Sequence, residues 1–209
     1  DDPDDHGPSG AVPIAATNFD GRTLTTVNLA NDTATNLNWT TNGVEDPGDM
    51  TAVKEDGGAF PGLFDGTPLT QNLFAAAINV GNLNIGWRTS VDLTVAAGST
   101  VTLTDVTFTY TAISGAQVLQ GPGVLRKSDF TITLFDPSAT PVGSVFIDDS
   151  LGDPTDEVSA VFATPIALSA PGTYTLEIFA DEAPETGNHI GIDDLSINGE
   201  VSGMPEPFQ

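Results

Sequence analysis

The residues of this sequence best suited to chemistry are two adjacent aspartates, Asp193 and Asp194, within an apolar segment near its C-terminal end. The isoleucines before the pair alternate on one face of an extended strand, whereas Leu195 and Ile197 after it alternate with the opposite parity. Because strand side chains have a period of two, this change of parity predicts a β-bulge at the aspartates. Two carboxylates in a half-buried strand are costly unless a cation neutralises them, and Ca²⁺ takes carboxylate and carbonyl oxygens. The pair therefore predicts a calcium site.

The elements that must position this site are β-strands. The chain has 209 residues with 22 glycines and 15 prolines, and short runs of Val, Ile, Thr and Phe separated by turn residues. This composition favours many strands joined by turns, and no long apolar stretch has a helical period. A second change of parity, between Leu103 and Val106, predicts a bulge near Asp105. We expect strands over residues 11–16, 23–29, 37–41, 73–80, 87–95, 101–112, 128–135, 142–147, 158–168, 173–180 and 189–201.

The order of these segments predicts a single all-β domain, a two-sheet antiparallel β-sandwich of the jelly-roll type. The sandwich is expected to span residues 11–201, after a flexible acidic arm at 1–10 and before a C-terminal tail at 202–209. Residues 42–68 carry turn signals throughout and predict one long surface loop. No linker or internal repeat divides the body.

The charge of the chain excludes several partners. It has 29 acidic and 5 basic residues, which gives a net charge of −24. Such a chain repels nucleic acid and anionic membrane, whereas it attracts Ca²⁺. No apolar stretch of about 18 residues is available to span a membrane. The chain has no cysteine, so it has neither disulfides nor thiol chemistry. We expect no nucleic-acid partner and no membrane span.

Catalysis has little support in the sequence. The two histidines are His6, in the acidic arm, and His189, at a strand start, and no Gly-x-Ser-x-Gly elbow is present. Zinc is disfavoured without cysteine or a second histidine within reach. A glycosidase needs two facing carboxylates. With 29 acidic residues in the chain some pair can satisfy any spacing, so the sequence does not discriminate a glycosidase from a protein that is not one. We expect a protein that is not an enzyme.

Two further features have two interpretations each. Trp39, Trp87, Tyr110 and Tyr174 can stack on sugar rings, but each also suits a core-facing strand position, which we favour for Trp39 and Tyr174. The acidic segment 148–157 is either a second calcium site or a solvated loop, and its spacing departs from the EF-hand pattern.

Both ends of the body resemble jelly-roll carbohydrate-binding modules with a galactose-binding-like fold. Asn18-Phe19-Asp20 followed by Trp39 is similar to the opening of those domains, and Ile192-Asp193-Asp194-Leu195 is similar to their closing strand. The resemblance implies that the two ends lie side by side and share a structural calcium ion. Its metal ligands would then be Asp20 and Asp193, with Asp194 as a further candidate.

The C-terminal segment Ser202-Gly203-Met204-Pro205-Glu206-Pro207-Phe208 resembles the start of a PEP-CTERM sorting signal. That signal continues into an apolar helix and a basic cluster, which this sequence does not contain. The resemblance implies secretion to the cell surface or extracellular matrix of a Gram-negative-type bacterium.

These observations predict a non-catalytic, secreted β-sandwich protein of the cell surface or matrix, stabilised by Ca²⁺. Its partners would be extracellular polysaccharide or other copies of itself, joined through the apolar segment Ala11–Ala16, which can add to a neighbouring sheet. A carbohydrate-binding module is the alternative function, and a polysaccharide-active enzyme is the third.

Overall fold

The chain folds into strands, and the computed structural model contains no helix among the residues it describes, which are 12–19, 23–28, 31–54, 73–75, 87–114, 129–148, 155–169, 171–181 and 188–202. Among these residues no helix is long and apolar enough to cross a membrane. The strands are β1 Val12–Thr17, β2 Thr23–Asn28, β3 Asn31–Thr35, β4 Thr40–Thr41, β5 Met50–Lys54, β6 Leu73–Ala75, β7 Trp87–Thr94, β8 Thr100–Ser114, β9 Asp129–Phe135, β10 Pro141–Ile147, β11 Thr155–Leu168, β12 Thr173–Asp181 and β13 Asn188–Ser202.

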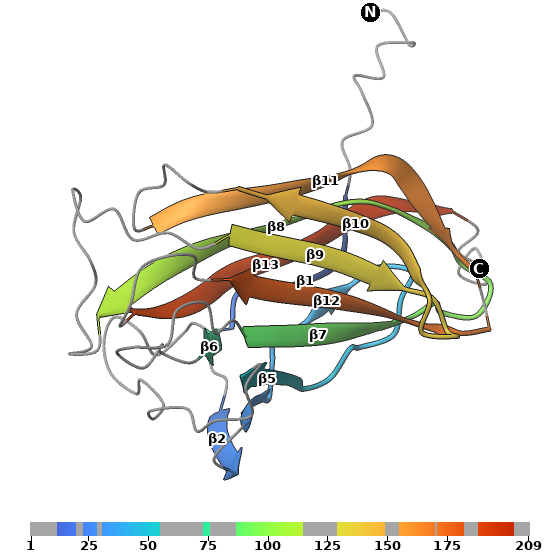
Figure 1. The fold of residues 1–209 in the computed structure, drawn as a ribbon. Coiled ribbons are helices and arrows are strands. Elements are labelled where there is room, and N and C mark those ends of the chain that lie inside the picture. The colour runs from blue at the N-terminus through green and yellow to red at the C-terminus, as the bar shows by residue number, and fades with distance from the viewer. Residues whose placement is uncertain are drawn as a thin grey trace, which may run out of the picture.

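The strands form two antiparallel sheets that pack face to face (Figure 1). Within the described residues, the six-stranded sheet has the order β11-β8-β13-β1-β4, with β6 also paired to β13. The seven-stranded sheet has the order β10-β9-β12-β7-β5-β3-β2. From β7 onward the chain repeatedly crosses between the sheets and brings β13 beside β1, which is the jelly-roll connectivity. The predicted fold class, an all-β sandwich, is confirmed.

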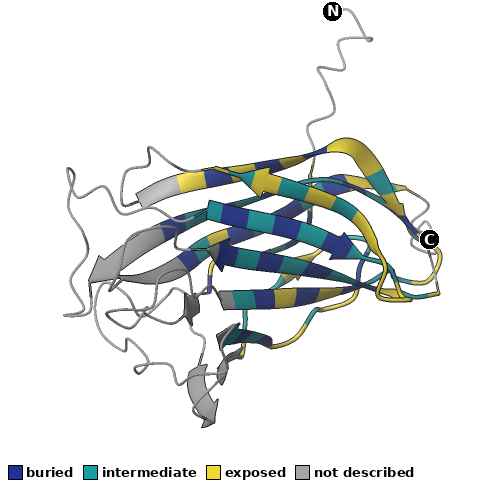
Figure 2. Cartoon of the chain, viewed as in Figure 1, coloured by how far each residue is buried: buried dark blue, intermediate teal, exposed yellow. Residues whose placement is uncertain are grey.

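The core lies between the sheets and follows from strand alternation. On β9, Phe130, Ile132 and Leu134 are fully buried, while the residues between them are only half-buried. The ring of Phe130 lies 5.1 Å, centroid to centroid, from the rings of both Phe108 and Tyr110 on the facing β8. Burying each such side chain stabilises the fold by about 1.5–3 kcal/mol. Figure 2 shows the same alternation along the strands of both sheets.

Both predicted bulges are confirmed. The register of β13 against β8 shifts between Asp193 and Ser196, and Asp194 has a positive φ of 50°. A second shift occurs where Asn198 pairs with Asp105 but Gly199 pairs with Leu103. Each bulge lets apolar side chains on both sides of it face the core, which explains the parity changes in the sequence.

Several predicted boundaries were wrong. The loop expected over 42–68 contains β5, which pairs with β3 and β7 in the seven-stranded sheet. The segment 37–41 is a strand only at its last two residues, and β3 was not predicted. In these segments polar side chains and turn residues mask the alternation of apolar side chains that identifies a strand. β3 pairs with its neighbour β2 and with β5, which lies farther along the chain. The arm at 1–10 and the rest of the expected loop, 55–68, lie outside the described residues.

The segment expected to join neighbouring copies is engaged in its own sheet. Residues 12–17 form β1, which pairs with β13 on one side, and Ala15 and Ala16 pair with β4 on the other. Adding this segment to another copy therefore requires that β1 first leave its own sheet. The pairing also places the N-terminal strand beside the Asp193-Asp194 bulge, as the resemblance implied.

The close approach of β13 to β8 makes Gly199 a sensitive position. A Cβ at Gly199 would lie 2.2 Å from the backbone oxygen of Thr102, whereas a Cβ at Gly143 would lie 2.3 Å from Cδ1 of Ile166, the end of a flexible side chain. We expect Gly199→Ala to lower the free energy of unfolding by roughly 1–3 kcal/mol, because the paired backbone of Thr102 cannot move aside as the end of a flexible side chain can. Gly143→Ala, the matched control, should cost less. Urea denaturation measures both, and equal stability of the Gly199 variant and the wild type would contradict this packing.

Candidate functional site

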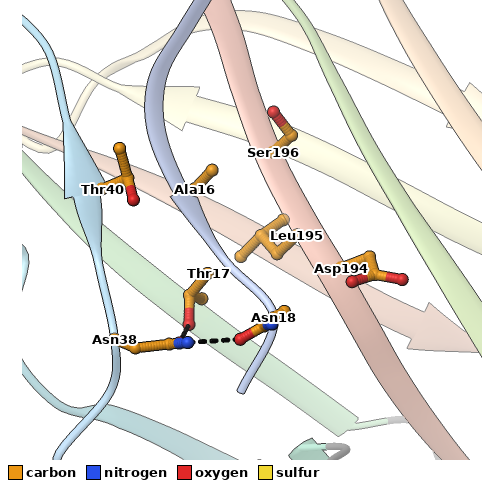
Figure 3. Close-up of a pocket in the computed structure, with 8 residues that line it drawn as sticks. All are labelled: Ala16, Thr17, Asn18, Asn38, Thr40, Asp194, Leu195 and Ser196. Atoms are coloured by element: carbon orange, nitrogen blue, oxygen red, sulfur yellow. Dashed lines mark hydrogen bonds between the residues drawn. The ribbon is translucent and has the colours of Figure 1, made fainter. Parts of the chain in front are cut away.

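A polar hollow of about 270 Å³ opens where β1 and β13 run side by side (Figure 3). Pairing of Ala16 with Ser196 and of Thr17 with Leu195 brings the two strands together. The small Ala16 side chain leaves room above the sheet, and the bulge turns Asp194 toward the rim. The lining residues are Ala16, Thr17, Asn18, Asn38, Thr40, Asp194, Leu195 and Ser196.

A hydrogen-bond network fixes one wall of this hollow. The backbone N–H of Phe19 donates to Oγ1 of Thr17 at 3.1 Å, and that hydroxyl donates to Oδ1 of Asn38 at 2.7 Å. The Nδ2 of Asn38 in turn donates to Oδ1 of Asn18. Phe19 is fully buried although its φ is 58°. The network therefore ties the segment before β4 to the end of β1 and holds the amides at the hollow.

The two aspartates have different surroundings. Asp193 is half-buried, its Oδ1 accepts a 2.9 Å hydrogen bond from the N–H of Asp194, and its carbonyl accepts one from Oγ1 of Thr109 at 3.3 Å. Asp194 is exposed, and in Figure 3 its carboxylate points away from the Asn18–Asn38 pair.

The residues that line the hollow carry carboxylate, amide and hydroxyl oxygens, and these are the kinds of ligand that Ca²⁺ binds. Among the described residues, however, no three His, Cys, Asp or Glu side chains gather closely enough to hold a metal ion. Asp20 lies outside the described part of the chain, two residues beyond Asn18. The metal site at Asp20, Asp193 and Asp194 stays a prediction.

A second candidate site is the outer face of the seven-stranded sheet, where aromatic side chains line up across strands. The registers place Phe146 of β10, Thr131 of β9, Phe179 of β12 and Arg88 of β7 in one row, here called the aromatic row. The neighbours of each ring along its strand face the core, so the rings face outward, and Phe146 is 62% exposed. Adjacent strands lie about 4.8 Å apart, so about 9–10 Å separates the two phenylalanine positions, with only Thr131 between them.

Arg88 and Glu177 hold one side of the aromatic row. The guanidinium carbon of Arg88 lies 5.7 Å from the centre of the Phe179 ring, and its Nη1 lies 3.7 Å from Oε2 of Glu177. The side chains of Arg88 and Glu177 are 43% and 27% exposed, so both reach solvent. The Arg88 cation therefore lies over the Phe179 ring.

Hydroxyl groups surround the aromatic row. Thr133 and Ser144 share a 3.0 Å hydrogen bond between β9 and β10, and Thr175 donates to Asp92 at 2.9 Å between β12 and β7. The face therefore combines the exposed ring of Phe146 and the half-buried ring of Phe179 with hydroxyl, carboxylate and guanidinium groups. That combination suits a ligand with apolar ring faces and many hydroxyls, such as a sugar.

The aromatic residues singled out from the sequence mostly belong to the core. Tyr110 is fully buried, and Tyr174 is 6% exposed with its hydroxyl accepting a 3.1 Å hydrogen bond from the N–H of Ser169. Trp39 packs against the core, and its Nε1 donates to the carbonyl of Gly48 at 2.7 Å. The core interpretation is confirmed for Tyr174, and sugar stacking by Tyr110 was wrong. The side chain of Trp87 lies outside the described residues.

Sequence reasoning missed Phe146 and Phe179, although a signal for them existed. On β12 the buried positions are Tyr174, Leu176 and Ile178, so the same parity assigns Phe179 to the outer face. Outward phenylalanines on neighbouring strands become a site only when the strand order and register are known.

No protein-family model matches this sequence, and no curated protein matches it. Among solved structures, TmCBM61 in complex with β-1,4-galactotriose is 11% identical over 88% of this chain and 92% of that chain, with a TM-score of 0.34. A structure of carbohydrate-binding modules from the β-sandwich superfamily is 13% identical over 90% and 85%, with a TM-score of 0.31. The arabinose-bound α-L-arabinofuranosidase MgGH51 is 10% identical over 90% of this chain and 27% of its own, with a TM-score of 0.43. The sugars in these structures belong to those proteins.

The left-handed backbone at the bulge predicts a difference between two substitutions of Asp194. Its φ of 50° suits Asn, which tolerates this region, but not a β-branched residue. We expect Asp194→Val to lower the free energy of unfolding by about 1–2 kcal/mol and Asp194→Asn to stay within about 0.5 kcal/mol of the wild type. Chemical denaturation in the presence of a chelator measures both without a metal contribution. Equal losses for the two variants would show that the backbone there is not left-handed.

Proposed function

We propose that this protein is a non-catalytic carbohydrate-binding β-sandwich of a bacterial cell surface or extracellular matrix. It binds polysaccharide on the outer face of the seven-stranded sheet, over β10, β9, β12 and β7. The sorting-signal-like tail supports the location, and the aromatic row supports the ligand.

The observation that carries the proposal is the pair of outward rings, Phe146 and Phe179, on either side of Thr131. A pyranose ring presents apolar C–H groups on its faces and hydroxyls at its edge. The two phenylalanine positions are about 9–10 Å apart across the intervening strand, with the short side chain of Thr131 between them, a spacing that suits a sugar ring bound between the two rings. Glu177 and Arg88 then lie within reach of its hydroxyls as acceptor and donor.

Charge narrows the class of glycan. The chain carries a net charge of −24, and Glu177 and Asp92 lie on the binding face. A uronate-rich polymer would meet like charge there, while the guanidinium of Arg88 is already paired. The ligand is therefore a neutral polysaccharide.

Loss of the Phe179 ring should weaken binding. We expect Phe179→Ala to raise the dissociation constant for the best neutral oligosaccharide at least about tenfold, which corresponds to 1.4 kcal/mol, because one stacking surface disappears. A glycan array selects the ligand, and calorimetry measures its affinity. Val12→Ala on the opposite sheet is the control, since Val12 is also exposed, at 44%. A wild-type chain that binds no neutral glycan, or unchanged affinity in the Phe179 variant, contradicts the proposal.

Calcium enters the proposal as a structural ion at the junction of β1 and β13. Two observations support it: Asp194 and Asn18 line the same hollow, and Asp20 follows Asn18 closely in the sequence. Asp20, Asp193 and Asp194 would supply the carboxylates. When bound, the ion would offset their mutual repulsion and join the two ends of the domain.

Calcium should raise the melting temperature, because a ligand that binds only the folded chain stabilises it. We expect a rise of several degrees in excess Ca²⁺ relative to a chelator, and a smaller rise in Asp194→Asn. Asp136→Asn is the control, because Asp136 lies in the β9–β10 turn, where its Oδ1 accepts hydrogen bonds from Ser138 and Thr140. Identical melting curves with Ca²⁺ and with chelator would contradict the calcium site, whereas the proposal of glycan binding would stand.

A further inference from the structure

The outer face of the seven-stranded sheet continues past the aromatic row, along β9. Figure 1 shows β9 between β10 and β12. Buried and half-buried residues alternate along β9, so Thr131, Thr133 and Phe135 all face outward. Thr131 belongs to the aromatic row, and the other two are the next outward positions along the same strand.

A row of polar side chains follows the aromatic row. The registers place Ser144 of β10, Thr133 of β9, Glu177 of β12 and Ser90 of β7 side by side, here called the polar row. Thr133 and Ser144 share one hydrogen bond, which uses one of their two hydroxyl hydrogens and leaves the other for a ligand. The carboxylate of Glu177 lies on the other side of Thr133 and can accept hydrogen bonds.

A third ring lies beyond the polar row. Phe135 of β9 is half-buried, and Pro141, which pairs with it from β10, is exposed. On its other side Phe135 pairs with Thr175, whose hydroxyl donates to Oδ1 of Asp92 at 2.9 Å. Phe135 lies four positions from Thr131, which corresponds to about 13–14 Å along the strand.

The aromatic row is limited in the direction across the strands. Within the described residues β10 is the last strand on one side of the sheet, so the row ends at Phe146. On the other side the guanidinium of Arg88 lies over the Phe179 ring and is paired with Glu177. The direction along β9 is different, because the residue between the aromatic row and Phe135 is the short Thr133. A long ligand therefore extends along β9.

We infer that this face binds an extended segment of polysaccharide that runs along β9, with Phe135 as a second stacking platform. The inference rests on the proposed glycan binding and adds the direction and the length of the ligand. One sugar lies between the rings of the aromatic row, the next contacts the hydroxyls and the carboxylate of the polar row, and a later one stacks on Phe135. A single pyranose ring is too short to contact both platforms.

Calorimetry with the best neutral glycan, as a series from the monosaccharide to the hexasaccharide, tests this inference. We expect the affinity of the wild type to rise with length until the ligand reaches Phe135, and then to level off. Phe135→Ala should raise the dissociation constant for the hexasaccharide at least about tenfold and leave that of the shortest bound ligand unchanged, because only a long ligand reaches this ring. Phe179→Ala should weaken binding at every length.

Two further variants complete the experiment. Phe135→Leu keeps an apolar side chain against the sheet and removes only the flat ring, so it should show the same loss even where the alanine variant does not fold. Val161→Ala is the matched control, since Val161 is 63% exposed on β11 of the other sheet. Thermal melts identify the variants that fold.

The outcomes separate this inference from the function on which it rests. Unchanged hexasaccharide affinity in Phe135→Leu, together with a loss in Phe179→Ala, would overturn the inference and leave glycan binding at the aromatic row. A wild type that binds the monosaccharide as tightly as the hexasaccharide would do the same. A wild type that binds no neutral glycan would overturn both.

Discussion

The position of β13 between β8 and β1 is the constraint on which the rest of the structure depends. This last strand contacts both the longest strand of its sheet and the first strand of the chain, so the sheet closes only when both ends of the sequence are in place. The close fit at Gly199 and the two bulges let β13 bury Ile192, Leu195 and Ile197 along its length despite the change of parity. The hollow beside Asp194 is a consequence of the same pairing.

The two faces of the sandwich have different chemistry because strand alternation separates inward from outward positions. Inward positions on β9 and β12 carry aliphatic and aromatic side chains that fill the core. Outward positions on the same strands carry threonines, Glu177 and Phe179, and strand pairing extends them into a row with Arg88 and Phe146. A row of this kind needs no loop or cleft, since the regular strand spacing sets the distance between the rings.

Charge and edges divide the remaining surface. Chains with a net charge of −24 repel one another wherever their acidic surfaces meet. Phe162 and Ile166 of β11, where the register against β8 shifts, lie against Gly143 of β10.

Much of the fold could be predicted because it follows from local periodicity. Alternation in β9 and β12, the bulges at Asp105 and Asp194, and the sandwich class are all visible in the sequence, since each reflects which side chains must face a core. The strands β3 and β5 could not be predicted, because the polar residues of β3 and the turn residues around β5 give no clear alternation. Pairing forms both strands: β3 pairs with β2 and β5, and β5 also pairs with the distant β7.

The sequence by itself determined the charge, the all-β class and the position of the paired aspartates. Only the tertiary structure decided that Tyr110 belongs to the core and that Phe146 and Phe179 share a row. The physical reason is that alternation assigns a side chain to a face, whereas its neighbours on that face depend on strand order and register, which the chain sets only when it folds.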